Sequence, residues 1–184
     1  MDYPLGTERV KPAYSAGNRV VLSALPGFAI AAVRPDGATG DAGSFVGAAR
    51  LGYALFDVGL EPFIQVGGNL AGPPAVWIDA GARLLLTPAL RDDHGSLRGT
   101  PFHIGPEIVA GAFLRPGPEA SGPGGVTYSG GLLTDVSFGA ALDIVLALSP
   151  SLQLEAQLGN LRWIPADGGS LLLLGATLGA GLRF

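Results

Sequence analysis

Residues 170–184 read SLLLLGATLGAGLRF, and they set the pattern from which the fold is predicted. Every second residue counted back from the end is apolar: Phe184, Leu182, Ala180, Leu178, Ala176, Leu174 and Leu172. The alternate positions hold Arg183, Gly181, Gly179, Thr177, Gly175 and Leu173. Because successive side chains of a β-strand point to opposite faces, this segment predicts a strand with one apolar face and one small or polar face.

Seven upstream segments repeat the alternation, and most are separated by turn residues such as Gly, Pro, Asp and Ser. The sequence Ser149-Pro150-Ser151 predicts a tight turn between two paired strands. The first segment alternates poorly and contains Pro26, and the third is the shortest. The predicted strands are residues 19–33, 45–55, 64–67, 76–86, 104–114, 134–148, 152–159 and 170–184.

Composition favours a membrane environment. Only 14% of residues are charged, against roughly 25% in ordinary soluble domains, and the mean hydropathy is +0.41. The uncharged stretch at residues 20–33 is shorter than the roughly 18 residues that a membrane helix needs, and it contains Pro26 and Gly27. Without such a helix, only a closed barrel satisfies the backbone hydrogen bonds inside a bilayer. We therefore predict an all-β fold, a closed antiparallel up-and-down transmembrane barrel of about eight strands, in residues 19–184.

The polar face decides which side of the barrel meets water. A soluble lipocalin-like barrel would need a dense cover of charges, whereas here this face is mostly Gly, Ser, Thr and Gln. We therefore expect the polar face to line the lumen, where glycines make room for long side chains. The predicted lumen network contains Arg50, Asp79, Arg83, Glu107, Asp143, Glu155 and Arg183. Gln65, His103, Asp135, Gln153 and Gln157 are also expected to point inward.

Two contacts are expected within this network. Arg83 and Glu107 lie on adjacent predicted strands, which favours a salt bridge between them. Asp143 and Glu155 lie on neighbouring strands at similar depth, so they could form an acid/base pair or share a proton. A structural network that closes the lumen is the favoured interpretation, since buried charges must be paired or hydrated.

The final segment, LGAGLRF at residues 178–184, resembles the last strand of small eight-stranded outer-membrane proteins of Gram-negative bacteria, of the OmpA transmembrane-domain and OmpX type. The resemblance implies that the barrel-assembly machinery reads Phe184 as a signal on the C-terminal strand. It also implies that both termini are periplasmic, with residues 1–18 as a periplasmic extension. Loops near residues 34–43, 70–75, 115–133 and 164–169 would then face outward. The long, charged connection 88–100 departs from the expected short periplasmic turn.

Other functional classes find little support. There is no cysteine, which excludes disulfides and thiolate chemistry, and the net charge of −4 predicts no nucleic-acid partner. No metal-ligand cluster, cofactor motif or Gly-x-Ser-x-Gly motif is present. The N-terminus does not resemble a signal peptide, so an exported protein is expected to be represented here in its mature form.

We therefore predict no catalytic site and no metal or cofactor, with outer-membrane lipid as the surrounding partner. The favoured function is a structural or surface-interaction barrel with a largely filled polar lumen. A narrow channel or a carrier of hydrophobic solutes is the alternative, and a lipid-modifying enzyme is a more distant one.

Overall fold

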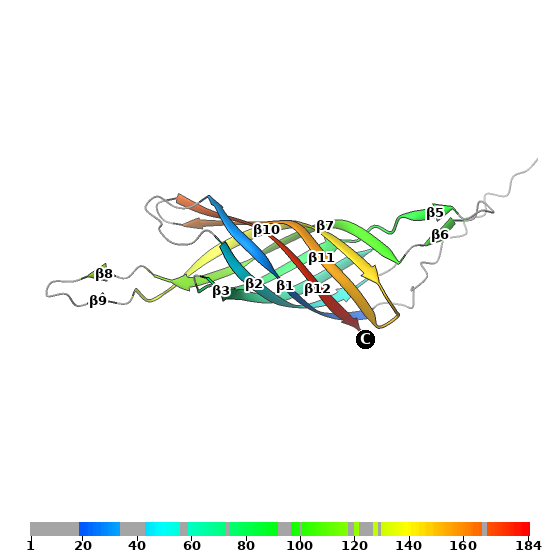
Figure 1. The fold of residues 1–184 in the computed structure, drawn as a ribbon, viewed down its shortest axis with the longest axis horizontal. Coiled ribbons are helices and arrows are strands. Elements are labelled where there is room, and N and C mark those ends of the chain that lie inside the picture. Colours follow the sequence, from blue (N-terminus) through cyan, green and yellow to red (C-terminus); the bar gives the residue numbers. More distant parts are fainter. Residues whose placement is uncertain are drawn as a thin grey trace, which may run out of the picture.

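The computed structural model describes residues 19–33, 43–55, 59–72, 74–91, 97–99, 101–117, 120–121, 127–128, 130–166 and 169–184. Within these ranges, eight long strands close into an antiparallel barrel (Figure 1). The strands are β1 (Arg19–Val33), β2 (Gly43–Ala54), β3 (Leu60–Ala71), β4 (Val76–Leu84), β7 (Phe102–Pro116), β10 (Leu132–Ala147), β11 (Leu152–Ala166) and β12 (Gly169–Arg183). Each strand pairs with its neighbours in chain order, and β1 pairs with β12 to close the ring. The predicted fold class is confirmed.

Two short hairpins extend beyond opposite ends of the barrel (Figure 1). One is formed by β5 (Ala89–Arg91) and β6 (Leu97–Gly99), on the side of the C-terminus. The other is formed by β8 (Ala120–Ser121) and β9 (Thr127–Tyr128), at the far end. The first accounts for part of the long connection 88–100. The N-terminal extension 1–18 and the loop 34–42 lie outside the described residues.

The third predicted strand was too short, because β3 runs for 12 residues from Leu60. Its inward positions include Glu61 and Phe63. From the local sequence, Glu61 resembles a turn residue and Phe63 resembles a residue of the outer face. The neighbouring strands supply the backbone hydrogen bonds that extend it in both directions. Strand length here follows from pairing with β2 and β4 rather than from local alternation.

Pro26 is accommodated inside β1 at the seam that closes the barrel. On the β12 side, the paired positions stop at Ala24 and resume at Gly27. On the β2 side, pairing continues without a break, and Pro26 lies opposite Gly47. Because proline has no backbone N–H to donate, the gap on one side is the physical consequence of its presence.

The outside of the barrel is apolar around its whole circumference. Large hydrophobic side chains are exposed on every long strand, for example Leu22 at 48%, Ile64 at 59%, Ile108 at 66% and Leu178 at 67%. A soluble monomer rarely exposes a contiguous apolar patch of more than a few hundred Å². In the described part of the chain, no helix is long and apolar enough to cross a membrane. The strands present this surface, and lipid is the solvent that suits it.

Aromatic side chains mark both rims of the exposed surface. Phe28 lies opposite Phe45, and Phe138 stacks on Trp163 with ring centroids 5.9 Å apart, towards the end that carries β8 and β9. The exposed ring of Phe184 lies at the opposite end, where its backbone N–H donates to the Val20 carbonyl oxygen at 3.0 Å. Such placement suits the two interfaces of a bilayer.

The chain's two tryptophans test the assignment of inside and outside. Trp163 is 47% exposed on the outer face, whereas Trp77 is 8% exposed inside the barrel. The test uses vesicles of phospholipid with brominated acyl chains, because bromine quenches indole fluorescence on contact. We expect the fluorescence of the Trp77→Phe variant, which retains Trp163, to be strongly quenched. The fluorescence of Trp163→Phe, which retains Trp77, should be little affected. Equal quenching of both variants would contradict the assigned faces.

Candidate functional site: the polar lumen

All seven predicted network residues are buried on the inner side of the barrel wall. They are Arg50, Asp79, Arg83, Glu107, Asp143, Glu155 and Arg183, and none exceeds 4% exposure. Other polar side chains are buried with them: Ser23, Glu61, Gln65, His103, Ser137, Gln153, Gln157, Arg162 and Thr177. Asp135 is only partly buried, and it pairs with Arg115 at 2.8 Å near the end of β7. The inner face thus holds a connected group of charges and amides.

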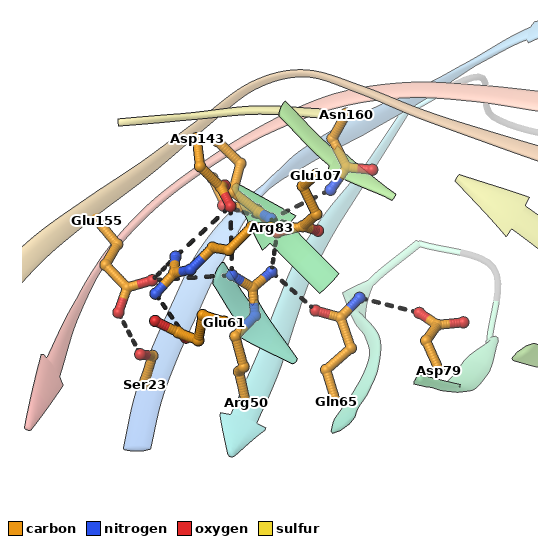
Figure 2. Close-up of polar contacts among 12 residues, drawn as sticks. Ser23, Arg50, Glu61, Gln65, Asp79, Arg83, Glu107, Asp143, Glu155 and Asn160 are labelled. Atoms are coloured by element: carbon orange, nitrogen blue, oxygen red, sulfur yellow. Dashed lines mark hydrogen bonds and ion pairs between the residues drawn. The ribbon is translucent and has the colours of Figure 1, made fainter. Parts of the chain in front are cut away.

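Arg50, on β2, lies at the centre of this group (Figure 2). Its Nη2 donates to Glu107 Oε2 at 2.6 Å and to Gln65 Oε1 at 3.2 Å. The guanidinium carbon is 4.0 Å from the centre of the Phe63 ring, a cation–π arrangement. Nη1 is 3.6 Å from Asp143 Oδ2, an ion pair without a hydrogen bond. Arg50 therefore ties β2 to β7 across the lumen.

Arg83, on β4, forms the second centre (Figure 2). Its Nη1 donates to Glu155 Oε2 at 2.6 Å and its Nη2 donates to Glu61 Oε1 at 2.8 Å. Nη1 is also 3.5 Å from Asp143 Oδ2. One guanidinium thus faces three carboxylates from three other strands, which is the charge-assisted geometry that arginine favours.

The predicted salt bridge between Arg83 and Glu107 is wrong. The two residues are direct partners in the register of β4 and β7. Both side chains point to the barrel axis, however, and the arginine contacts Glu61, its register partner on β3, and Glu155 across the lumen. Glu107 instead accepts from Arg50. Arg83 thus pairs with one of its two register partners, Glu61, and not with the other, Glu107, so adjacency alone does not determine which ions pair.

Asp143 and Glu155 are brought together, as expected, with a guanidinium between them. Both lie within 3.5 Å of Arg83 Nη1, and both also face Arg50 Nη1, at 3.6 and 3.9 Å. Two carboxylates separated by two arginines form an ion-pair cluster. This arrangement offers no open position where a substrate atom could approach them.

Arg162, on β11, forms a second ion pair towards the end that carries β8 and β9. Its Nη1 and Nη2 donate to the two oxygens of Asp79 at 2.9 and 2.6 Å, a bidentate contact. Nη1 also donates to Ser137 Oγ at 2.9 Å, and the guanidinium carbon is 5.1 Å from the Trp77 ring centre. Gln65 connects the two clusters, because its Nε2 donates to Asp79 Oδ2 at 2.9 Å.

Sequence reasoning missed Arg162 because β11 contains a bulge. Its register with β12 shifts between Gln157 and Asn160, and Gly159 has a positive φ of 59°. Before the bulge, odd-numbered residues such as Gln157 point inward, whereas after it the inward residues are Arg162 and Ile164. A Gly-Asn pair within an alternating strand was the available signal. Glu61 was missed because it lies outside the third predicted strand, residues 64–67.

The lumen differs at its two ends. Near the C-terminus, His103 Nδ1 hydrogen-bonds Thr87 Oγ1 at 2.7 Å, and Arg183 Nε donates to Gln153 Oε1. A cavity of about 180 Å³ lies there, with Leu60 and Leu86 among its lining residues. At the other end, a cluster of apolar side chains is buried in the interior, beside a pocket whose lining also includes Asn69 and Arg162. Among the described residues, no group of three or more His, Asp or Glu side chains could hold a metal ion.

A closed barrel with an apolar exterior and a charged interior defines an integral membrane protein of the β-barrel class. No protein family and no curated protein matches the sequence. Among solved structures, the chain is similar to the attachment invasion locus protein Ail of Yersinia pestis, with 17% identity, a TM-score of 0.50, and coverage of 91% of this chain and 99% of Ail. The same protein in complex with the heparin analogue sucrose octasulfate gives a TM-score of 0.51.

Neisserial surface protein A is similar as well, with 18% identity, 91% and 96% coverage, and a TM-score of 0.48. At these identities, the comparisons show the fold. The chain has the fold of small eight-stranded outer-membrane barrels, and its apolar exterior agrees with a location in the outer membrane. The predicted fold resemblance is confirmed, and the predicted outer-membrane location agrees with it. The assembly role of Phe184 stays a prediction.

Proposed function

We propose that this chain is an integral outer-membrane barrel with a structural or surface-interaction role, whose lumen is closed by its polar network. One observation carries the proposal: guanidinium groups that are 0–1% exposed lie at the centre of the lumen and are bonded to carboxylates from strands that are not their neighbours. The charges are neutralised in place, where a hydrated ion would otherwise have to pass.

Lumen-facing glycines support the proposal because they provide space for these carboxylates. A Cβ built on each of three inward glycines would overlap a carboxylate oxygen of the network. The pairs are Gly52 with Glu61, Gly111 with Asp79, and Gly181 with Glu155. The wall and the network are therefore fitted to each other, which suits a filled interior better than an open path.

The surface-interaction part of the proposal is supported by the shape of the molecule. The β8–β9 hairpin projects beyond the barrel at the end opposite the C-terminus (Figure 1). In an outer-membrane protein with periplasmic termini, this end faces the outside of the cell. A projecting hairpin on a rigid barrel is a common way to present a binding surface.

Planar-bilayer recording tests the closed lumen. We expect refolded protein to give no conductance steps, because the two arginine clusters leave no continuous aqueous path. Folding is verified beforehand by the different gel migration of unheated and boiled samples, and a boiled sample is the control for detergent leakage. Reproducible steps from folded protein would contradict closure and favour the narrow-channel alternative, which the cavity near the C-terminus supports.

A further inference from the structure

The inner face of the barrel is not polar along its whole length. At the end that carries β8 and β9, Val46, Trp77, Phe113 and Ile164 are buried against one another, with exposures between 0 and 8%. Ala29, Ala75, Leu171 and Leu173 pack around them. We call these eight residues the apolar layer. Its members come from six of the eight long strands, β1, β2, β4, β7, β11 and β12, and from Ala75, which immediately precedes β4. A small pocket on the side of β1, β2 and β12 adjoins both the layer and Arg162.

The apolar layer begins one inward position beyond the ion pair of Asp79 and Arg162, which we call the outer ion pair. In β4, Trp77 precedes Asp79 by two residues, and in β11, Ile164 follows Arg162 by two residues. Inward positions of a strand recur every second residue, so these are successive steps along the lumen. The polar network therefore ends at the Asp79–Arg162 pair, and the apolar layer lies between it and the loops.

Specific packing holds the aromatic side chains of the apolar layer in place. Trp77 and Phe113 stack nearly parallel, with an interplanar angle of 4° and centroids 6.5 Å apart. Gly67 is the register partner of Trp77, and a Cβ on Gly67 would overlap the indole ring. The chain thus provides space for a large aromatic side chain at a position where outer-membrane barrels usually carry polar residues.

We propose that the apolar layer is a separate barrier that keeps water and ions out of the lumen from the loop-bearing end. Hydrophobic constrictions close pores by excluding water, without any need for charge. The inference deepens the proposed closed lumen and rests on it: the ion pairs occupy the middle, and the apolar layer separates them from the aqueous phase beyond the loops.

A single introduced thiol tests the barrier, since the chain has no cysteine. Ser137 is fully buried directly beneath the layer, where its Oγ accepts from Arg162. We expect the thiol of Ser137→Cys to react slowly with a small water-soluble reagent, methyl methanethiosulfonate. Adding Trp77→Ala and Phe113→Ala should accelerate labelling by about tenfold or more, because the site then opens towards the loops.

The barrel itself offers a matched control. Phe138 and Trp163 form a second stacked aromatic pair, on the lipid-facing side of the wall. Replacing both with alanine removes the same kind of side chains while leaving the layer intact, so labelling at Ser137→Cys should stay slow. The exposed turn variant Ser151→Cys gives the rate of a thiol in free contact with water.

A milder variant covers the case in which the double alanine substitution does not fold. Val46→Thr places a hydroxyl in the apolar layer with almost no change of volume, and it should also accelerate labelling. The inference is overturned if Ser137→Cys already reacts as fast as Ser151→Cys, or if folded layer variants react no faster than the lipid-facing control. Conductance by the unsubstituted protein would instead overturn the proposed function, so the two failures are distinguishable.

Discussion

Replacing Arg83 with alanine will lower the free energy of unfolding of the barrel by about 3–5 kcal/mol, because removing one partner of a buried ion pair leaves uncompensated charge. Three carboxylates depend on this guanidinium: those of Glu61, Glu155 and Asp143, which are nearly fully buried. The loss can be measured by denaturant titration of the refolded protein in lipid vesicles, with tryptophan fluorescence as the signal.

Arg115→Ala is the matched control for this prediction. Arg115 also makes a 2.8 Å contact with a carboxylate, that of Asp135, but the two side chains are 31% and 17% exposed. Pairs exposed to water contribute about 0–1 kcal/mol, so the control should change stability little. Similar losses for Arg83→Ala and Arg115→Ala would show that the lumen is hydrated around Arg83. The double variant Arg83→Ala/Glu155→Ala should lose less than the sum of its single substitutions.

Placing an arginine on the outer surface at the middle of β7 gives the second large effect. We expect Ile108→Arg to cost about 2–4 kcal/mol, the range for a charge on the lipid face of a barrel at the bilayer midplane. Ile108 is 66% exposed and lies near the centre of the strand. Unfolding titrations in the same vesicles measure the cost, which would be almost absent if this face met water.

Leu132 is the matched position for that experiment. It is 68% exposed, nearly the same as Ile108, but it is the first residue of β10 and lies opposite Pro116 at the end of the barrel. Near the interface, an arginine costs about 0–1 kcal/mol, so Leu132→Arg should be tolerated. Equal costs at both positions would be inconsistent with a bilayer centred on the strands.

Together, these contacts describe a barrel whose outer and inner faces are stabilised in opposite ways. Outside, apolar side chains are exposed to lipid and need no partner. Inside, Arg50, Arg83 and Arg162 are placed where carboxylates from other strands reach them, and glycines leave the necessary space. The interior charges restrain the wall from within, while the apolar layer separates them from the loops.

Much of this was predictable from local sequence. Alternation with a period of two is a property of neighbouring residues, so the number of strands and most of the lipid-facing and inward residues were predicted without tertiary information, with Glu61 and Arg162 as exceptions. β1 was predicted at its observed bounds despite Pro26. The seven charged residues of the predicted lumen network all lie in the lumen, because each occupies one of the alternate positions that face inward on its strand.

Only the closed barrel decided which of these charges meet. The partners of Arg50 and Arg83 depend on how the strands are staggered around the ring, a property of all eight strands together. For the same reason, the direct neighbours Arg83 and Glu107 do not pair. A bulge near Gly159 changed the phase of β11, which brought Arg162 inside and formed the outer ion pair. The alternation of the sequence thus determined which side chains point inward, whereas distances across the lumen, set by register and stagger, determined their contacts.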